Sequence, residues 1–385
     1  MSLDLPTDVV DAVRDRLARQ PGALTPHRVA EALRETGRPV GDATVLAVHE
    51  TLLRDVVGAG PLEPLLRTPG VTDVLVNGPD AVYLDRGAGL EESGIRFSDD
   101  EAVRRLAQRL AASGGRRLDD ASPYVDVRLG DGTRCHAVLA PVAAPGTLVS
   151  LRVPRPRGFT LDELVAARTL TTEGARLLQE VVRCRLAFLV SGGTGSGKTT
   201  LLASMLSVVA PTERLVLVED AAELRPAHPH VVSLEARPAN IEGAGEITLR
   251  TLVRQALRMR PDRLVVGEVR GGEVVELLAA LNTGHEGGCG TLHANSAGDV
   301  PARVEALALA AGLGRDAAHS QLASAVDAVL HLGRRPDGSR VLREVAVPVR
   351  EPSGLVCLEK AVEFSHDGTD RAGPAADQLA RRLRR

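Results

Sequence analysis

Apolar residues recur every three or four positions through the first 57 residues of the chain. They fall on single faces of expected helices at Val9, Val13 and Leu17, and again at Val45, Val48, Leu52, Leu53 and Val56. Thr25 followed by Pro26 predicts a helix start between these runs, because Thr caps a helix N-terminus and Pro suits its first position. We expect a helical N-terminal extension over residues 1–57, which either packs on the rest of the chain or docks a partner.

The pattern changes near residue 58 to short runs that alternate apolar and polar positions, as strands do. The runs are 74–76, 82–84, 124–129, 133–139 and 148–153. The stretch from Ser98 to Glu101 is a capping box, which predicts a helix that ends near Ser113. We expect a small α+β domain over residues 58–155, followed by a linker at 156–160.

From residue 161 onwards, short apolar runs alternate with helical patterns. Three of these runs are typical of buried parallel strands, at 186–190, 215–218 and 264–266. The apolar spacing from Leu249 to Leu257 predicts a helix before the third run, and the alternation at 341–347 predicts an outer strand. We expect an α/β nucleotide-binding domain over residues 161–350 and a solvated C-terminal tail over 351–385.

Composition narrows the class of protein. The length of 385 residues suggests roughly two or three domains. With 44% apolar residues, 25% charged residues and a net charge of −3, the chain is neither disordered, collagenous nor a disulfide scaffold. It has only four Phe, two Tyr and no Trp, whereas channels for single-stranded nucleic acid combine a basic groove with stacking rings. We therefore expect no nucleic-acid partner.

The spacing of the four cysteines and the absence of long apolar runs bear on the cellular compartment in which the protein is expected. Cys135, Cys184, Cys289 and Cys357 form no C-x-x-C pair, so neither a zinc ribbon nor a disulfide framework is expected. No run approaches the ~20 apolar residues that cross a bilayer, and the acidic start of the chain lacks the apolar core of a signal peptide. These features favour a reduced, cytoplasmic setting in which any membrane attachment is peripheral.

Residues 192–199 read Gly-Gly-Thr-Gly-Ser-Gly-Lys-Thr and fit the phosphate-binding pattern G-x-x-x-x-G-K-[ST]. The segment follows an expected strand and enters an expected helix at 200–209, a context that a chance match lacks. Its backbone N–H groups would surround phosphate oxygens, aided by the positive end of the helix. Lys198, one of only two lysines among 47 basic residues, would reach the β- and γ-phosphates of ATP, and Thr199 would hold Mg²⁺.

Acidic residues end two of the expected strands. Glu219 and Asp220 follow the run at 215–218, and Glu268 follows the run at 264–266. The carboxyl ends of parallel strands face the ligand crevice, and hydrolysis there needs bound Mg²⁺ and an oriented water. An acid at such a strand end also occurs as a helix N-cap, and that alternative stays open for each acid on its own.

Two histidines, His285 and His293, lie in the polar, glycine-rich segment 283–295 that follows the second acidic strand. A lone histidine is more often a structural residue with satisfied hydrogen bonds. Two in one such segment could sense a γ-phosphate or stabilise charge. Composition leaves both interpretations open.

Four motifs in this order make the chain similar to the type II/type IV secretion ATPase family, which powers secretion systems, pili and conjugation. They are the Walker A loop at 192–199, the Asp box at 219–224, the Walker B segment at 264–271 and the His box at 283–295. Segments 58–66 and 71–78 also resemble the family, and most closely its tight-adherence (Tad) pilus branch. The resemblance covers about residues 50–350.

The resemblance implies a fold, an assembly and ligands. The fold is a RecA-like P-loop motor domain preceded by a small α+β, PAS-like domain. The assembly is a homohexamer that works with an inner-membrane platform protein, and the ligands are ATP and Mg²⁺. The nucleotide would contact Gly193, Thr194, Gly195, Ser196, Gly197, Lys198, Thr199 and Thr200.

The resemblance also implies roles for single residues. Glu219 would be the general base that orients the attacking water, and Glu268 would support Mg²⁺ together with Thr199. His293, with His285, would read the γ-phosphate.

The chain departs from the family at two places. Its His box carries Gly288-Cys289-Gly290, where members more often have Ser, an aliphatic residue and Thr, and this predicts a looser loop. The paired-cysteine zinc insertion of many type II members is absent, which favours the Tad or type IV side.

Three arginines share one face of the expected strands of the small domain. Alternation along these strands places Arg128, Arg134 and Arg152 on the polar face. The face is either solvated, with local ion pairs, or carries the arginines that in this family reach the nucleotide phosphates.

We expect an ATP-hydrolysing hexameric motor that powers pilus assembly or protein secretion at the cytoplasmic membrane. Two alternatives stay open. One is a nucleotide-gated binding or regulatory module with little turnover, for which the looser His box would be the reason. The other is a DNA-translocating conjugation ATPase, which the slightly acidic charge balance disfavours.

Overall fold

The computed structural model describes most of the chain. The described residues are 13, 16, 25–35, 41, 44–46, 48–49, 58–87, 89–154, 158–237, 239, 244–365 and 370–384. The chain divides into two compact units, residues 1–155 and 156–385. Among the described residues, no helix has both the length and the apolar character needed to cross a bilayer.

The helix start expected at Thr25 and Pro26 is confirmed. Helix α2 (Pro26–Arg34) begins there, and the Thr25 hydroxyl accepts a hydrogen bond from the backbone N–H of Arg28. Its buried residues belong to a small apolar cluster of Val13, Val29, Ala32, Leu33, Val45 and Val48. The other apolar positions expected in this extension, at 9, 17, 52, 53 and 56, lie outside the described residues.

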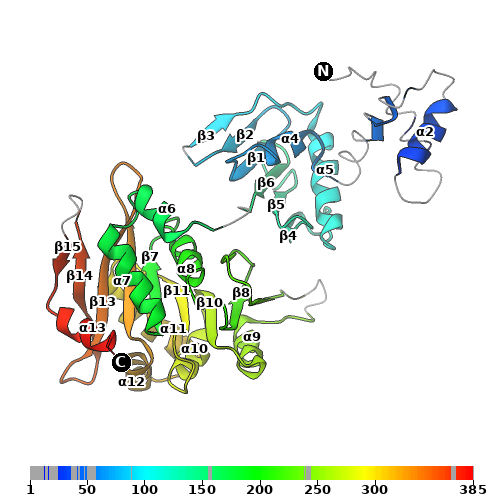
Figure 1. Cartoon of the computed structure of the whole chain (residues 1–385). Coiled ribbons are helices and arrows are strands. Elements are labelled where there is room, and N and C mark those ends of the chain that lie inside the picture. The colour runs from blue at the N-terminus through cyan, green and yellow to red at the C-terminus, as the bar shows by residue number, and fades with distance from the viewer. Residues whose placement is uncertain are drawn as a thin grey trace. The chain divides into compact units, whose positions relative to one another are not determined.

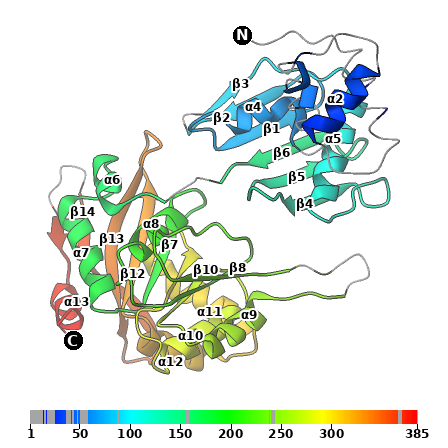
Figure 2. The same cartoon turned by 45° about the vertical axis from the view of Figure 1, so that its right-hand side comes forward.

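The first unit contains a six-stranded antiparallel sheet with a helix on one face. Its elements are η1 (Gly60–Leu62), α4 (Glu63–Leu66), β1 (Asp73–Asn77), β2 (Val82–Asp85), β3 (Leu90–Glu92), α5 (Asp100–Ser113), β4 (Tyr124–Arg128), β5 (Arg134–Val138) and β6 (Leu148–Arg152). The strand order is β3-β2-β1-β6-β5-β4 (Figure 2). Alternate strand residues and the apolar stripe of α5 form one core. The five expected strands and the expected helix are confirmed.

Helix α5 begins one residue later than its sequence pattern predicts. Asp99, not Ser98, is the N-cap, and its carboxylate accepts the backbone N–H of Ala102 at 2.7 Å. Asp100 instead accepts the backbone N–H of Thr147 at 2.5 Å and its hydroxyl at 3.1 Å. This second carboxylate ties the start of the helix to the segment that leads into β6.

The second unit is built on a nine-stranded mixed sheet. Its strands are β7 (Phe188–Gly192), β8 (Leu215–Glu219), β9 (Val231–Glu235), β10 (Arg263–Val269), β11 (Cys289–His293), β12 (Ala328–Arg334), β13 (Arg340–Arg350), β14 (Val356–Phe364) and β15 (Asp370–Ala372). The order is β15-β14-β13-β12-β7-β11-β10-β8-β9. From β12 to β9 neighbouring strands are parallel, and from β12 to β15 they are antiparallel.

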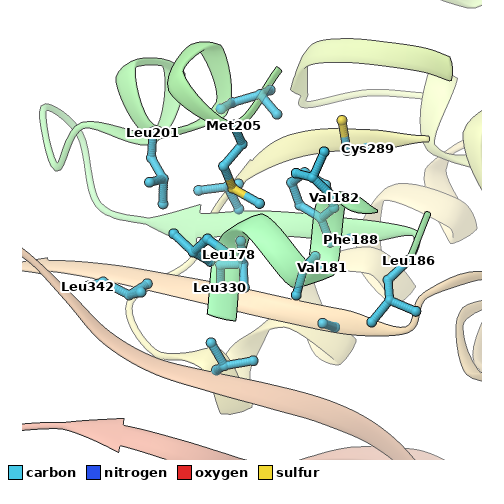
Figure 3. Packing of buried hydrophobic residues seen from close by; sticks show 14 of the residues in the cluster. Leu178, Val181, Val182, Leu186, Phe188, Leu201, Met205, Cys289, Leu330 and Leu342 are labelled. Carbon is cyan, nitrogen blue, oxygen red and sulfur yellow. The ribbon is translucent and has the colours of Figure 1, made fainter. Parts of the chain in front are cut away.

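Helices cover both faces of this sheet (Figure 1). They are α6 (Leu161–Ala166), α7 (Thr172–Arg183), α8 (Lys198–Leu206), α9 (Leu249–Ala256), η2 (Leu257–Met259), α10 (Glu273–Leu281), η3 (Ala297–Asp299), α11 (Val300–Ala310), α12 (Arg315–Ala325) and α13 (Ala376–Arg382). One core joins α6, α7, α8 and α13 to the sheet, and a second core joins α9 to α12 to the opposite face. Figure 3 shows Leu178 of α7 and Met205 of α8 near Phe188 of β7. The expected α/β class is confirmed.

The C-terminal segment belongs to the second unit, so the expectation of a tail over 351–385 is wrong. β14 pairs with β13 from Val356 to Glu363, and α13 buries Leu379 in the core. For the same reason the run at 341–347 lies inside the sheet as part of β13 and is not an outer strand. Its neighbour β14 alternates buried and half-buried residues weakly, and for that reason the sequence pattern did not reveal it.

Candidate active site

The glycine-rich loop connects β7 to α8, as its sequence context predicts. The strand ends at Gly192 and the helix begins at Lys198. Gly195 and Gly197 have φ values of 67° and 97°, a backbone conformation that residues with a Cβ rarely adopt. Such turns direct successive backbone N–H groups to one side and form an anion-binding concavity at the helix N-terminus. The loop therefore suits the phosphates of a nucleotide.

Lys198 is held inside this loop. Its side chain is 7% exposed, and its ammonium donates to the carbonyl oxygens of Gly192 and Gly193, both at 3.1 Å. Burial lowers the pKa of Lys198, and the charge of Glu268 opposes that shift. Two backbone oxygens thus help to position the lysine for a phosphate.

His293 connects Lys198 to Glu268. The Lys198 nitrogen lies 3.3 Å from Nδ1 of His293, and Nε2 of the same ring lies 2.7 Å from a carboxylate oxygen of Glu268. A neutral imidazole with its proton on Nε2 satisfies both contacts, accepting from the lysine and donating to the glutamate. A cation, an imidazole and an anion from three different elements thus meet beside the loop.

Glu219 lies at the end of β8 and is buried, with 3% of its surface exposed. One carboxylate oxygen accepts the backbone N–H groups of Glu223 at 3.0 Å and Leu224 at 2.9 Å. Burial raises the pKa of Glu219 to about 7, although these two hydrogen bonds oppose the shift. A Cβ at Gly267 would lie 2.6 Å from Cγ of Glu219, so only glycine leaves room for this carboxylate beside β10.

Asp220 and Arg270 form an ion pair that joins the ends of β8 and β10. Burial raises the pKa of Asp220, and the Arg270 guanidinium opposes the shift. The sequence marks Asp220 only as a neighbour of Glu219, and it offers no partner for Arg270. β8 and β10 are parallel, and Val218 lies beside Val266. The residues that follow, Asp220 and Arg270, therefore lie at the same edge of the sheet.

The structure does not bring His285 to this site. His285 precedes β11, whose first residue, Cys289, pairs with Phe188 at the start of β7. His293 pairs with Gly192 at the other end of the same strands. The His285 ring lies 3.3 Å from the carbonyl oxygen of Ala280. The expectation that both histidines face the phosphates is wrong in placing His285 there, because the length of β11 separates them.

The Gly288-Cys289-Gly290 segment is tightly packed, so the expected looser loop is also wrong. A Cβ at Gly288 would lie 2.5 Å from a Leu281 methyl carbon, and one at Gly290 would lie 3.0 Å from the carbonyl oxygen of Val266. Cys289 is fully buried, and burial raises the pKa of its thiol to about 12. Small residues allow β11 to approach β10 and α10.

The hairpin of β12 and β13 supplies contacts that the motifs do not reveal. Arg334 and Arg340 both donate to the carbonyl oxygen of Gly195 in the glycine-rich loop. Below the loop, the Ser191 hydroxyl lies 2.9 Å from Nδ1 of the buried His331, whose pKa burial lowers. One feature of the sequence could have indicated these contacts. Four arginines surround the turn at Pro336 to Gly338, namely Arg334, Arg335, Arg340 and Arg343.

In the first unit, the three expected arginines form one row across the sheet. Arg128 of β4 lies opposite Arg134 of β5, which in turn lies opposite Arg152 of β6. Arg134 also lies 3.8 Å from a carboxylate oxygen of Asp126. Their shared face is therefore established within the first unit, and both interpretations of it, a solvated face or a phosphate-binding face, fit this row.

The residues of the second unit fit ATP and Mg²⁺. The positive-φ glycines, the buried Lys198 and the buried Ser196 hydroxyl, which has no hydrogen-bond partner, provide donors for phosphate oxygens. Among the residues that the structure places, no three His, Cys, Asp or Glu side chains gather into a metal site. Mg²⁺ commonly binds through one or two protein oxygens plus substrate phosphates, a role open to Thr199 at the start of α8 and to Glu268.

Comparison with protein families gives one match over most of the chain. The family model described as type II/IV secretion system protein matches residues 55–360. A Mycobacterium tuberculosis protein named for conjugal transfer is 60% identical over 349 residues, covering 89% of this chain and 99% of that protein. The conjugal transfer protein TrbB of Rhizobium radiobacter is 31% identical over 281 residues, covering 71% of this chain and 83% of its own.

Comparison with solved structures supports the fold. The ATPase DotB of Legionella pneumophila superposes with a TM-score of 0.53 at 19% identity, over 74% of this chain and 79% of that chain. At this identity the likeness concerns the fold alone. It confirms the expected RecA-like α/β architecture preceded by a smaller α+β part.

Proposed function

This chain belongs to the type II/IV secretion system protein family, and on that premise we propose that it is an ATP-hydrolysing motor. Six copies form a ring at the cytoplasmic face of a membrane, where an inner-membrane platform protein is the partner. The observation that carries the proposal is the convergence of Lys198, His293 and Glu268 beside the glycine-rich loop. Glu219 ends β8, the strand beside β10, which carries Glu268.

In the proposed reaction, water attacks the γ-phosphorus of ATP and the bond to the β,γ-bridging oxygen breaks, giving ADP and phosphate. Lys198 and the loop N–H groups bind the β- and γ-phosphates, as in other P-loop enzymes. Glu219 orients the water and accepts its proton, for which a carboxylate with a pKa near neutrality is suited. Thr199 and Glu268 would hold Mg²⁺, which would neutralise part of the phosphate charge when bound.

His293 is proposed to read the γ-phosphate. It contacts Lys198 on one side and Glu268 on the other, so a phosphate that draws the lysine away changes both contacts at once. This gives the motor a means of distinguishing ATP from ADP. His285 has no part in this proposal, because it lies at the opposite end of β11.

Arg128, Arg134 and Arg152 are proposed to neutralise phosphate charge during hydrolysis. Their row across three strands concentrates positive charge along one line of the sheet. Three cations placed side by side repel each other and gain from a shared polyanion. Local carboxylates also face this row, because Asp73 of β1 lies opposite Arg152 and Asp126 lies 3.8 Å from Arg134.

The machine that the motor serves is the second part of the proposal. Segments 58–66 and 71–78 resemble the Tad pilus branch, whereas two relatives carry names that refer to conjugal transfer. We therefore propose an assembly or transfer machine of the pilus, secretion or conjugation type. The nucleotide-gated module with little turnover is disfavoured. The reason for considering it was a loose His box, whereas Gly288 and Gly290 are closely packed.

The test is ATP hydrolysis by the purified full chain with Mg²⁺, measured together with its mass in solution. We expect turnover that depends on Mg²⁺ and a hexamer stabilised by ATP. Tight ATP binding by a hexamer without turnover would overturn the motor in favour of the binding module. Stimulation of turnover by DNA would assign the motor to DNA transfer, and no DNA effect would favour pilus assembly or protein secretion.

A further inference from the structure

The carbonyl oxygen of Gly195, in the middle of the glycine-rich loop, accepts three hydrogen bonds from two arginines. Arg334 donates through Nη2 at 2.9 Å and through Nε at 3.2 Å, and Arg340 donates through Nε at 3.1 Å. Hydrogen bonds from a charged donor are about twice as strong as neutral ones. This carbonyl therefore has more and stronger partners than a surface loop oxygen needs.

The topology of the sheet explains why both arginines reach the same atom. β12 runs parallel to β7, with Leu332 beside Gly192, so Arg334 lies two residues past the point where the loop begins. The chain then turns, and Arg340 at the start of β13 lies directly opposite Arg334. Two like charges in such a cross-strand pair repel each other, and a shared acceptor offsets that repulsion.

The same contacts determine the orientation of the loop. The Gly195 carbonyl and the Ser196 N–H belong to one planar trans peptide unit and point in opposite directions, so a carbonyl held outward turns that N–H inward. The two guanidinium groups lie on that outer side, close enough that a Cβ on Gly195 would meet Arg334 at 2.6 Å and one on Gly197 would meet Arg340 at 3.2 Å. They bind the outward carbonyl and so favour the conformation with the N–H groups turned inward.

We propose that Arg334 and Arg340 are positioning residues of the nucleotide site, which hold the Gly195 carbonyl outward so that the loop is ready for phosphate. The inference rests on the proposed ATP hydrolysis and extends it to two residues outside the four motifs at 192–199, 219–224, 264–271 and 283–295. The carbonyl of Arg334 accepts in turn from Nη2 of Arg343 at 2.7 Å, which supports the hairpin itself.

The test compares Arg334→Gln, Arg340→Gln and the double variant with Arg335→Gln. Arg335 belongs to the same hairpin and carries the same charge, but it donates no hydrogen bond to Gly195. The readouts are the Kd of a fluorescent ADP analogue, the KM and kcat for ATP, and the Tm of each variant. We expect each single Gln variant to raise Kd and KM about tenfold, with kcat within about twofold because ground and transition states lose the same binding.

Two results would overturn the inference. One is nucleotide affinity equal to wild type in the double variant. The other is an equal loss in Arg335→Gln, which would mean that only the positive field of the hairpin matters. If a Gln variant has a lower Tm than wild type, Arg334→Lys distinguishes the two explanations, because it keeps the charge and one donor. Partial recovery of nucleotide affinity in Arg334→Lys would support the positioning role. No recovery in a folded protein would contradict that role. Failure of the wild-type chain to bind ADP or hydrolyse ATP would contradict the proposed function instead.

Discussion

The ammonium nitrogen of Lys198 lies 3.3 Å from Nδ1 of His293. The two residues come from different motifs 95 positions apart, and the adjacency of β7 and β11 brings them together. In this arrangement the lysine that would bind the phosphates already contacts the residue that would report on them. A change at either residue should therefore alter both binding and turnover.

Replacing Lys198 by Ala should abolish ATP hydrolysis. The ammonium is buried inside the glycine-rich loop, and the loss of one such preorganised donor lowers kcat by about 100-fold or more. Steady-state ATPase assays measure this. Lys360→Ala is the matched control, because it removes the other lysine, which pairs with Glu344 and Glu363 at the protein surface. Equal activity of the two variants would contradict the assigned role.

Glu219 should make stability depend on pH. Its pKa of about 7 in the folded chain lies above the ordinary value of 4.5, so folding favours the protonated carboxyl. That stabilisation is fully present below pH 4.5 and is lost as the pH rises through 7. Between about pH 5 and about pH 8, wild type should lose about 2–3 kcal/mol of unfolding free energy relative to Glu219→Gln. Urea unfolding of both proteins measures the difference, and parallel pH profiles would contradict the prediction.

The same residue should shape the pH dependence of turnover. If the ionised Glu219 accepts the proton of water, kcat/KM should rise with pH through about 7 and then level off. Glu219→Gln should lose most of the activity and this rise, while still binding ADP. A pH–rate profile from pH 5.5 to 9, with ADP affinity as the control for folding, distinguishes this role from a merely structural one.

The arginine row of the first unit should matter for catalysis more than for stability. Replacing Arg128, Arg134 or Arg152 by Ala removes charge that is proposed to stabilise the transition state, and an arginine finger contributes about 10³-fold or more in rate. Arg105→Ala on the exposed side of α5 is the control. Wild-type turnover in all three variants would favour the solvated face with local ion pairs.

Packing beneath the His box can be tested through stability alone. Gly288→Ala places a methyl group against Leu281 and the Leu264 carbonyl and should cost about 1–3 kcal/mol of unfolding free energy. Gly314→Ala is the control, because its φ of −66° suits any residue and no atom lies within 4 Å of the added methyl. Chemical denaturation compares the two. Similar stabilities would indicate that β11 tolerates a looser fit.

Much of this architecture was predictable because local patterns were strong. Buried runs followed by acids gave β8 and β10, and the glycine-rich loop defined the start of α8. The alternation around residues 124–153 predicted the arginine row correctly, since a strand period of two determines which residues share a face. These features depend on near neighbours in the sequence.

What sequence reasoning missed depends on long-range contacts. His285 and His293 look equivalent along the chain, and only the length of β11 separates them. Arg334 and Arg340 carry no motif, and their role emerges from the parallel pairing of β12 with β7. Gly288 and Gly290 predict a loose loop from the sequence alone, whereas neighbouring helix and strand atoms leave little room for a side chain there.

The late strand β14 has a practical consequence for anyone who shortens this chain. A fragment ending at residue 350, the expected end of the motor domain, would lack β14 (Val356–Phe364), the strand that pairs with β13. The backbone groups of Val345 and Val347 would then line an open, apolar strand, which is a template for pairing with other chains. Such a fragment should aggregate, whereas one that retains residues up to 384 should remain monodisperse.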